Sequence, residues 1–233
     1  MEIEIWSDVM CPWCAIGKAR FEAALAGFAQ RDAVHVRWRS FELDPQAPRV
    51  QPGDMATRLA QKYGTGVERA RAMMDHVTQT AAEVGLTFDF RKAQPGNTFD
   101  AHRLLHLAAA RGRQDALKTR LMAAYLCEGE AVGRPEVLQR LAEAAGLDAT
   151  EVATVLGSDA FADDVRADER MAGQIGVRGV PFFVLDGRYG VSGAQPVEVF
   201  AQALAQAWGT RTVTPLAIES SGGPVCGDDG CAI

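Results

Sequence analysis

The chain lacks the features that would place it in a membrane or on a nucleic acid. None of its apolar runs reaches the roughly 20 residues that a bilayer-spanning helix needs. Basic residues are not in excess either, because 24 lysines and arginines stand against 30 aspartates and glutamates, which gives a net charge of −6. Phosphate-rich surfaces repel such an acidic chain. We therefore expect neither nucleic acid nor membrane as its main partner.

The chain also has few cysteines and no pattern typical of a secretory signal. The chain has five cysteines in 233 residues, two of them in one motif, which suits a catalytic dithiol better than a scaffold held by disulfides. The segment that begins at Met1 has no basic stretch, apolar core or small-residue cleavage site of a secretory signal. We therefore expect a cytoplasmic protein, in a compartment where thiols stay mostly reduced.

What the chain does contain is a Cys-Pro-Trp-Cys motif, between an apolar run at 3–9 and a helical pattern at 12–30. At a helix start, unpaired backbone N–H groups and the helix dipole favour the thiolate of Cys11. Pro12 fits the first helical turn, which does not use its missing N–H. Cys14 follows about one turn later, within reach of Cys11. The motif predicts a redox dithiol with Cys11 and Cys14 as catalytic residues; two core cysteines or half of a zinc site are the alternatives.

Hydrophobic periodicity predicts a strand–helix–strand opening, a long helical region, and a closing hairpin with a final helix. The second strand is expected at 34–41, parallel to the first. Three prolines between 44 and 53 mark a linker. The helices expected after it are 54–63, 67–84, 98–111 (capped by Thr98), 114–128, 135–145, 149–156 (with Asp148 and Glu151 as a capping box) and 159–174. The hairpin strands are expected at 180–185 and 189–192, and the last helix at 196–208.

Three stretches carry a resemblance to a known family: Ser7 to Cys14, Asn97 to Arg103, and Gly179 to Phe183. In this order of elements they resemble the FrnE-like oxidoreductases, a DsbA-like group of the DsbA/2-hydroxychromene-2-carboxylate isomerase superfamily. The resemblance covers about residues 1–208. It implies an α/β thioredoxin fold with a large inserted all-helical domain. The corresponding domains are 1–44 with 175–208 for the discontinuous thioredoxin part, 45–174 for the insertion, and 209–233 for a C-terminal tail.

The resemblance also implies an activity and a substrate site. The activity is thiol–disulfide exchange or isomerisation on protein, peptide or small-molecule thiols and disulfides. The site includes a cis peptide bond between Val180 and Pro181 beside Cys11, where the backbone of Val180 would pair with an incoming peptide; a trans proline at a strand start is the alternative. The other residues expected to bind substrate are Pro12, Trp13, Asn97 and His102.

One position departs from the thioredoxin pattern. Thioredoxins carry a buried carboxylate six residues before the first cysteine, and here Ile5 occupies that position. Another group must therefore take the proton of Cys14. Asp8 is the nearest candidate, with a surface position near the helix start as the alternative. His102 is a second candidate because histidine titrates near neutral pH, unless it lies on a helix surface.

The remaining cysteines leave more than one interpretation open. Cys226 and Cys231 form a second pair in the tail, which either exchanges with the first dithiol at high local concentration or forms an incidental or structural disulfide. Zinc binding through Cys11 would block the helix start, so we expect no metal and no bound cofactor. Glutathione is expected at most as a co-substrate. Cys127 lies on an apolar helix face and is predicted to be a core residue.

Two rival functions share parts of this pattern. Kappa-class glutathione transferases and hydroxychromene carboxylate isomerases have the same insertion architecture, which makes a glutathione-dependent isomerase or transferase the second hypothesis. In those enzymes a serine generally replaces the first cysteine, whereas this chain has both Cys11 and Cys14. The third hypothesis is a peptide-binding chaperone that uses the groove beside Pro181 without thiol chemistry.

Overall fold

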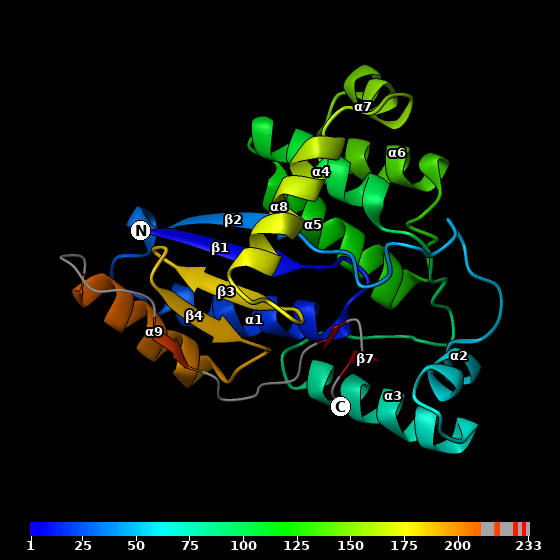
Figure 1. Ribbon diagram of the computed structural model, residues 1–233, viewed down its shortest axis with the longest axis horizontal. Coiled ribbons are helices and arrows are strands. Elements are labelled where there is room, and N and C mark those ends of the chain that lie inside the picture. Colours follow the sequence, from blue (N-terminus) through cyan, green and yellow to red (C-terminus); the bar gives the residue numbers. More distant parts are fainter. Residues whose placement is uncertain (211–216, 220–225, 228–229, 232–233) are drawn as a thin grey trace.

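A mixed five-stranded sheet forms the centre of the computed structural model, which describes residues 1–210, 217–219, 226–227 and 230–231 (Figure 1). The strands are β1 (Glu2–Ser7), β2 (His35–Ser40), β3 (Phe182–Leu185), β4 (Tyr189–Ser192) and β5 (Ala217–Glu219). Their order in the sheet is β2-β1-β3-β4-β5. β1 pairs parallel with β2 and antiparallel with β3, and β3 forms an antiparallel hairpin with β4. The predicted parallel opening and closing hairpin are therefore confirmed.

Helix α1 (Pro12–Ala26) connects β1 to β2 and ends earlier than the sequence pattern suggests. We predicted a helix to about Gln30, which is wrong. Gly27 ends the helix because glycine is a poor helix former, and a short 3₁₀ turn, η1 (Arg31–Ala33), leads into β2. Phe28 follows the apolar spacing of the helix although it lies beyond the helix end, because it has a separate packing partner. Its ring packs edge-on against Trp208 of helix α9 (Val197–Gly209), with the ring centres 5.8 Å apart.

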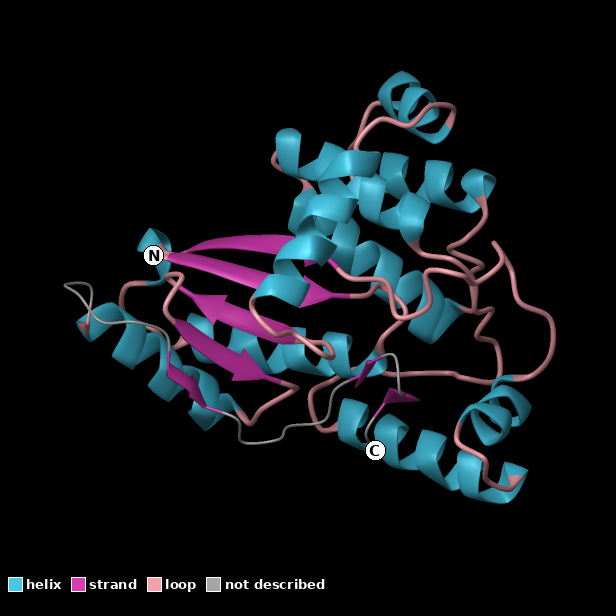
Figure 2. Ribbon diagram, viewed as in Figure 1, coloured by secondary structure: helices cyan, strands magenta, loops and turns pink. Residues whose placement is uncertain are grey.

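The sheet lies between two layers of helices. On one face, α1 and α9 pack against it (Figure 2), and Phe21, Phe183 and Phe200 meet there in tilted and edge-on contacts. On the other face lies α8 (Ala162–Gln174), where the indole N–H of Trp6 donates to the carbonyl of Asp168 at 2.9 Å. The sheet is thus buried on both sides, which explains the mixed apolar pattern of its central strands.

The region between β2 and β3 is helical throughout, as predicted. Besides α8 it contains α2 (Met55–Lys62), α3 (Val67–Ala82), α4 (Phe99–Ala110), α5 (Gln114–Ala123), α6 (Pro135–Ala144) and α7 (Ala149–Leu156). Most ends lie within one or two residues of the expected ones, which is the usual spread of helix boundaries. Helix α8 begins at Ala162 rather than 159 because Phe161 has a left-handed backbone (φ 63°), which no α-helix continues.

The predicted cap of α4 is wrong in its detail. The side chain of Thr98 does not cap the helix. Instead, the Asn97 side-chain oxygen accepts from the amide of Phe99 at 2.9 Å, and the Thr98 hydroxyl donates to Asp8 at 3.3 Å. The threonine therefore links the insertion to the segment before the Cys-Pro-Trp-Cys motif.

Only half of the predicted capping box of α7 forms. The Asp148 carboxylate accepts from the amides of Thr150 and Glu151, as an N-cap does. Glu151 does not return a bond, because its carboxylate pairs with Arg111 across the surface at the end of α4.

The helix expected at 114–128 is α-helical only to Ala123. The next five residues, Ala124–Glu128, form a π-helix (η2), and Gly129 ends it with a left-handed backbone (φ 77°). A π turn holds one residue more than an α turn and so changes which side chains face the core. Tyr125 lies in this turn and is buried near the start of α1.

The proline-rich linker between β2 and α2 packs on the insertion. Its Gln51 amide donates to the Pro95 carbonyl at 2.7 Å, and the Asn97 amide donates to the Pro48 carbonyl at 2.9 Å. The carbonyl of Arg49 lies so close to Gly133 that a Cβ there would come within 1.9 Å of its oxygen. These contacts hold the linker against the inserted helical region.

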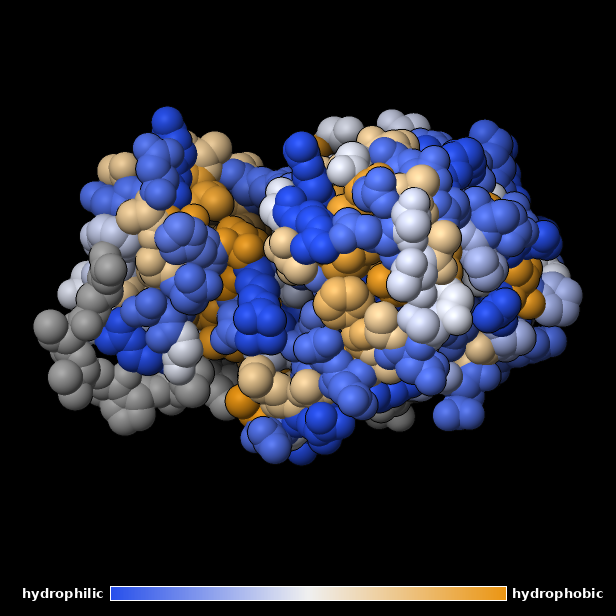
Figure 3. All heavy atoms as spheres, turned by 90° about the horizontal axis from the view of Figure 1, so that it is seen from above, coloured by the Kyte–Doolittle hydropathy of each residue, from blue (hydrophilic) through white to orange (hydrophobic). Residues whose placement is uncertain are grey.

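The apolar core has two parts, and the larger one joins the sheet domain to the insertion. It contains Cys11 and Cys14 together with Leu104 and Leu121 of the inserted helices. Hydrophilic residues cover most of the face in Figure 3, with apolar atoms showing in recesses. In the part of the chain that the structure describes, no helix has the length and apolar character to cross a membrane.

Candidate active site

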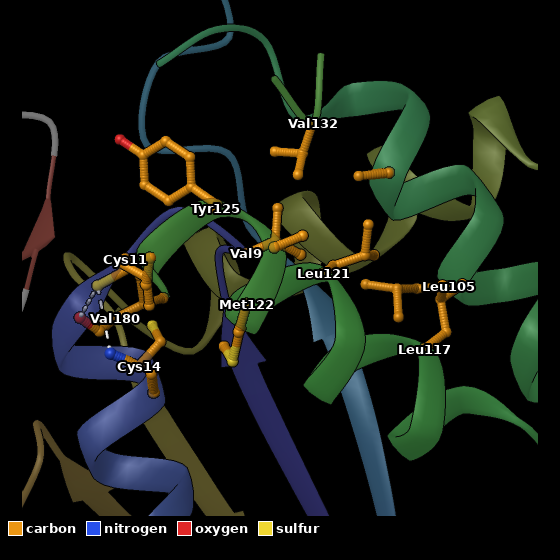
Figure 4. Packing of buried hydrophobic residues seen from close by; sticks show 14 of the residues in the cluster. Val9, Cys11, Cys14, Leu105, Leu117, Leu121, Met122, Tyr125, Val132 and Val180 are labelled. Carbon is orange, nitrogen blue, oxygen red and sulfur yellow. Dashed lines mark hydrogen bonds between the residues drawn. The ribbon is translucent and has the colours of Figure 1, made fainter. Parts of the chain in front are cut away.

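The two motif cysteines meet at the first turn of α1. Cys11 is the N-cap residue of the helix, and its sulfur accepts a hydrogen bond from the Cys14 amide at 3.4 Å. The Cys11 thiol also donates to the Val180 carbonyl at 3.7 Å (Figure 4). Both cysteines are free thiols and both are fully buried. An incoming sulfur must therefore displace neighbouring atoms to reach Cys11.

Cys14 is held as a neutral thiol. Burial raises its pKa well above the ordinary value, and the hydrogen bond with Cys11 and the charge of Cys11 act in the same direction. The charge of Lys118 and the amide of Asp8 oppose this rise. Because the thiolate is the nucleophile in exchange reactions, Cys14 can react only when a nearby group stabilises its anion or takes its proton.

The loop before β3 closes the site from the other side. The Val180–Pro181 peptide bond is cis, as the resemblance implied, so the trans alternative falls away. Pro181 packs directly on α1 at Gly17, where a Cβ would lie 2.8 Å from the proline Cγ. A side chain at position 17 would therefore push apart the two segments that carry Cys11 and Val180.

Asp8 lies beneath the motif and is buried, with only 2% of its surface exposed, so the surface alternative is wrong. Its carboxylate accepts from the Leu43 amide at 2.8 Å and from the Thr98 hydroxyl and the Met10 amide at 3.3 Å. Burial alone would raise its pKa, but His102 and the Leu43 amide outweigh that effect and lower it. Asp8 is therefore a buried carboxylate that stays charged.

The structure brings His102 and Asp8 together but leaves Asn97 apart from the dithiol. His102 is 1% exposed, and its Nε2 lies 3.8 Å from an Asp8 oxygen without a hydrogen-bond partner among the described residues. Asn97 instead reaches the Glu42 carboxylate at 3.4 Å. Burial raises the pKa of Glu42, although Arg166 pairs with it at 2.5 Å.

Sequence reasoning missed Lys118, a fully buried lysine of α5. Its Nζ donates to the Ser7 carbonyl at 3.2 Å, at the end of the strand that leads to the motif. Burial lowers its pKa to about 8, although Cys14 and Asp8 act in the opposite direction. The signal lay in the helix pattern, because Lys118 shares a buried face with Leu117 and Leu121.

A pocket of about 210 Å³ opens beside the motif at Pro12 and Trp13. Its apolar walls include Met10, Met55, Met74, Leu59, Phe90 and Tyr125. Arg58 and Lys62 of α2 add positive charge. Of the residues expected to bind substrate, Pro12 and Trp13 line this pocket, whereas Asn97, His102, Val180 and Pro181 do not.

A second buried polar cluster, Ser40–His106–Asp168, lies where β2 meets α4 and α8. Its composition matches a hydrolase triad, but its geometry does not. The Ser40 hydroxyl (3.1 Å) and an Asp168 oxygen (3.2 Å) both face Nε2 of His106, so the acid cannot orient the base through the other ring nitrogen. Asp168 also accepts from Arg39 at 2.8 Å and from the Ser40 amide at 2.9 Å. The cluster therefore joins α8 to the sheet.

The other cysteines lie away from this arrangement or outside the described side chains. Cys127 is half-buried, packs against the larger core cluster and lines a small pocket, so the predicted core position is confirmed only in part. Cys226 and Cys231 face each other in the backbone pairing of β6 (Cys226–Gly227) with β7 (Gly230–Cys231), but their side chains are outside the described residues. Among the described residues, no cluster of three or more histidines, cysteines and carboxylates is arranged to hold a metal.

Known proteins share this architecture. Residues 2–205 match the model of a family described as DSBA-like thioredoxin domain. The crystal structure of a probable DsbA oxidoreductase, SCO1869 from Streptomyces coelicolor, is 53% identical with a TM-score of 0.87, covering 100% of this chain and 99% of that one. The uncharacterized protein YwbO of Bacillus subtilis (strain 168) is 28% identical over 88% of this chain and 96% of its own. A 2-hydroxychromene-2-carboxylate isomerase structure shares the fold at 17% identity and a TM-score of 0.62, covering 88% and 95% of the two chains.

Proposed function

The chain belongs to the DsbA-like thioredoxin domain family, and from this premise we propose that it is a thiol–disulfide oxidoreductase whose reacting atoms are the sulfurs of Cys11 and Cys14. The observation that carries the proposal is the position of Cys11 as the N-cap of α1, with the amide of Cys14 directed at its sulfur. A backbone N–H at this place stabilises a thiolate on Cys11. The loop at Val180 and Pro181 supplies the backbone that a substrate peptide would meet.

The reaction proceeds through a mixed disulfide. In the oxidising direction, a substrate thiolate attacks Cys11 in the Cys11–Cys14 disulfide. A bond forms between the substrate sulfur and Cys11, the Cys11–Cys14 bond breaks, and Cys14 leaves with the electron pair. A second substrate thiolate then attacks the sulfur of the first, which releases the substrate disulfide and the Cys11 thiolate. The substrate loses two electrons, and the dithiol gains them. The reducing direction runs the same steps backwards.

Two single variants test the assignment of the two cysteines. In Cys14→Ser, the Cys11 thiolate should attack a peptide disulfide, expel one peptide thiolate and stay trapped as a mixed disulfide, because the resolving sulfur is missing. Cys11→Ser should trap none and should lose exchange activity in insulin reduction. Cys127→Ser is the matched control and should behave as the unmodified chain. Exchange activity that persists in Cys11→Ser would refute the proposal, as would thiol titration that finds no reversible Cys11–Cys14 bond.

The pocket beside Pro12 favours one alternative, a glutathione-dependent isomerase or transferase. Arg58 and Lys62 would attract the carboxylates of glutathione, and the apolar walls would hold a second substrate. That activity would survive in Cys14→Ser and would require glutathione, whereas dithiol exchange needs both cysteines. A peptide-binding chaperone, the third candidate, would keep its holding activity when both cysteines are replaced by serine.

The finer assignments are part of the same proposal. We propose the FrnE-like subtype and a cytoplasmic location, with glutathione as co-substrate rather than a bound cofactor. We also propose that the pair Cys226 and Cys231 exchanges with Cys11 and Cys14. Mass spectrometry after stepwise oxidation tests that exchange. A relay requires either a Cys226–Cys231 bond or a mixed disulfide between the tail and the active site.

A further inference from the structure

Lys118 is a buried charge with no carboxylate in ion-pair contact within the described part of the chain. Its Nζ donates to the Ser7 carbonyl (3.2 Å) and lies over the face of Trp38, whose ring centre is 5.5 Å away. It makes no ion pair with any residue of the described part of the chain. An unpaired buried ammonium is costly and uncommon in proteins. Its presence therefore calls for an anion that forms nearby.

A second lysine, Lys18, contacts the same tryptophan ring but is paired with carboxylates. Lys18 of α1 also lies over the Trp38 ring, at 5.6 Å, but it pairs with Glu22 and, at 3.1 Å, with Asp115. Its charge is therefore balanced by two carboxylates. Lys118, one turn along α5 from Asp115, has no such pairing and is more deeply buried.

The ionisable groups around Lys118 come from two elements. Cys11, Cys14 and Lys18 belong to α1, and Asp8 lies in the turn between β1 and α1. Cys14, Asp8 and Cys11 interact with Lys118 as anions, and Lys18 as a like charge. Asp8 carries a constant charge because its own pKa is lowered. Cys11 can carry a thiolate only when the dithiol is reduced, and Cys14 carries one only while it leaves or attacks, so the charge balance around Lys118 depends on the redox state.

We propose that Lys118 is the counter-charge of the dithiol, which stabilises the Cys14 thiolate each time that sulfur leaves or attacks. The inference rests on the proposed exchange activity and adds a role that the family's buried carboxylate cannot fill here, because Ile5 stands in its place. Lys118 acts on Cys14 through charge, so it is a positioning residue rather than a reacting one.

Lys118 acts when the Cys11–Cys14 bond breaks and when it forms again. When a substrate thiolate attacks Cys11, the Cys11–Cys14 bond breaks and Cys14 receives the electron pair beside the Lys118 ammonium. In the reverse step, the Cys14 thiolate attacks Cys11 in the mixed disulfide and expels the substrate thiolate. A positive charge that stabilises the Cys14 thiolate lowers the barrier of this step in both directions, while the resting Cys14 stays a neutral thiol. Lys118 therefore speeds thiol–disulfide exchange.

Three variants, compared by the rate at which glutathione reduces the Cys11–Cys14 disulfide at pH 7, test the role. Lys118→Met removes the charge at similar volume and should slow this reaction at least tenfold, because Cys14 then leaves without its counter-charge. Lys118→Arg keeps the charge and should recover most of the rate. Lys18→Met, the matched control against the same tryptophan, should change the rate by less than a factor of about three.

The pH dependence separates a charge effect from loss of packing. In Lys118→Met, resolution of a mixed disulfide between Cys11 and a peptide should be at least tenfold slower at pH 7 and should recover as the pH rises, because hydroxide then generates the Cys14 thiolate. A variant damaged only in its packing would be slowed equally at every pH. An unchanged exchange rate and an unchanged pH profile would overturn the inference while leaving the proposed function standing. If the unmodified chain forms no reversible Cys11–Cys14 disulfide, the proposed function itself fails.

A titration of Lys118 in the unmodified chain tests the same inference even if Lys118→Met does not fold. Since a Cys11 thiolate, which exists only in the reduced dithiol, favours the Lys118 ammonium, reduction raises the pKa of Lys118. NMR of a chain with ¹³C-labelled lysines should therefore show Lys118 titrating at higher pH in the reduced protein than in the oxidised one. Titration at the same pH in both states would overturn the proposal.

Discussion

The thiol of Cys11 lies 3.7 Å from the carbonyl oxygen of Val180, a residue 169 positions further along the chain. The contact joins the first turn of α1 to the loop before β3. It depends on the close approach of α1 to that loop, because Pro181 rests on Gly17 with no space for a side chain. The position of the reactive sulfur is therefore set by packing between two distant segments.

Gly17→Ala tests this packing. The added methyl group would lie 2.8 Å from Cγ of Pro181, so the loop must shift. We expect a loss of about 1–3 kcal/mol in the free energy of unfolding and slower exchange at Cys11. Urea denaturation and insulin reduction measure the two effects. Gly173→Ala is the control, because its Cβ would meet open space within α8 and alanine favours helix by about 1 kcal/mol over glycine. Equal stability of the two variants would contradict the packing argument.

Asp8→Asn tests the buried carboxylate beneath the motif. The amide would place donors against the Leu43 amide and the Thr98 hydroxyl, and we expect a loss of about 2 kcal/mol at pH 7. The folded pKa of Asp8 is lowered, so its stabilisation is fully present above the ordinary aspartate pKa of about 3.9 and is lost as the pH falls further. The difference between the two chains should therefore shrink below about pH 4. A difference that stays constant down to pH 3 would show that the carboxylate charge is not the cause.

The exposed Asp54 provides the comparison for Asp8→Asn. Asp54 caps α2 through the Thr57 amide at 3.0 Å, and asparagine caps a helix about as well as aspartate does. Asp54→Asn should therefore leave the free energy of unfolding within about 0.5 kcal/mol of the original value.

Asp168→Asn tests the joint between α8 and the sheet. The substitution leaves Arg39 paired with Glu4 alone and removes the charge that faces His106, so we expect a loss of about 2 kcal/mol in the free energy of unfolding. Asp164→Asn, in the exposed first turn of the same helix, should change it by less than about 0.5 kcal/mol. Chemical denaturation of both variants at pH 7 is the measurement. If Asp168→Asn changed the free energy of unfolding as little as Asp164→Asn, the Asp168 cluster would not be what holds α8 on the sheet.

Met74→Trp tests whether substrates enter the pocket beside Pro12. The larger ring would fill space between α3 and the motif, and we expect kcat/KM for a peptide or glutathione-sized substrate to fall roughly tenfold. Exchange with the small reagent dithiothreitol should change little, because it needs less room. Met73→Trp is the matched control, since Met73 does not line the pocket. An equal loss with dithiothreitol would show that the substitution disturbed Cys11 rather than the pocket.

The sequence predicted those parts of the fold that depend on residues close together in the chain. Apolar spacing located the inserted helices, because each buries one stripe of its own sequence. The Cys-Pro-Trp-Cys motif located the helix start, because its residues act within a single turn. The Val180–Pro181 bond followed from the resemblance, and the structure has it in the cis form.

The parts that were missed depend on contacts between distant residues. Phe28 continues the apolar spacing of α1, yet it packs on Trp208 beyond the end of the helix. Thr98 is a residue type that often caps helices, yet its hydroxyl donates to the Asp8 carboxylate instead. The apolar stripe of α5 places Lys118 on a buried face, but its contact with the Ser7 carbonyl could not be read from that stripe. In each case the partner lies far away in the sequence, and local patterns do not identify it.

The order in which the chain is made gives the contact between Cys11 and Val180 a consequence for biosynthesis. A ribosome releases the Cys-Pro-Trp-Cys segment before the whole insertion and the Val180 segment only after it. Contacts between such distant segments close late in folding. The nascent polypeptide therefore leaves both sulfurs open to oxidation or modification until the last strands arrive.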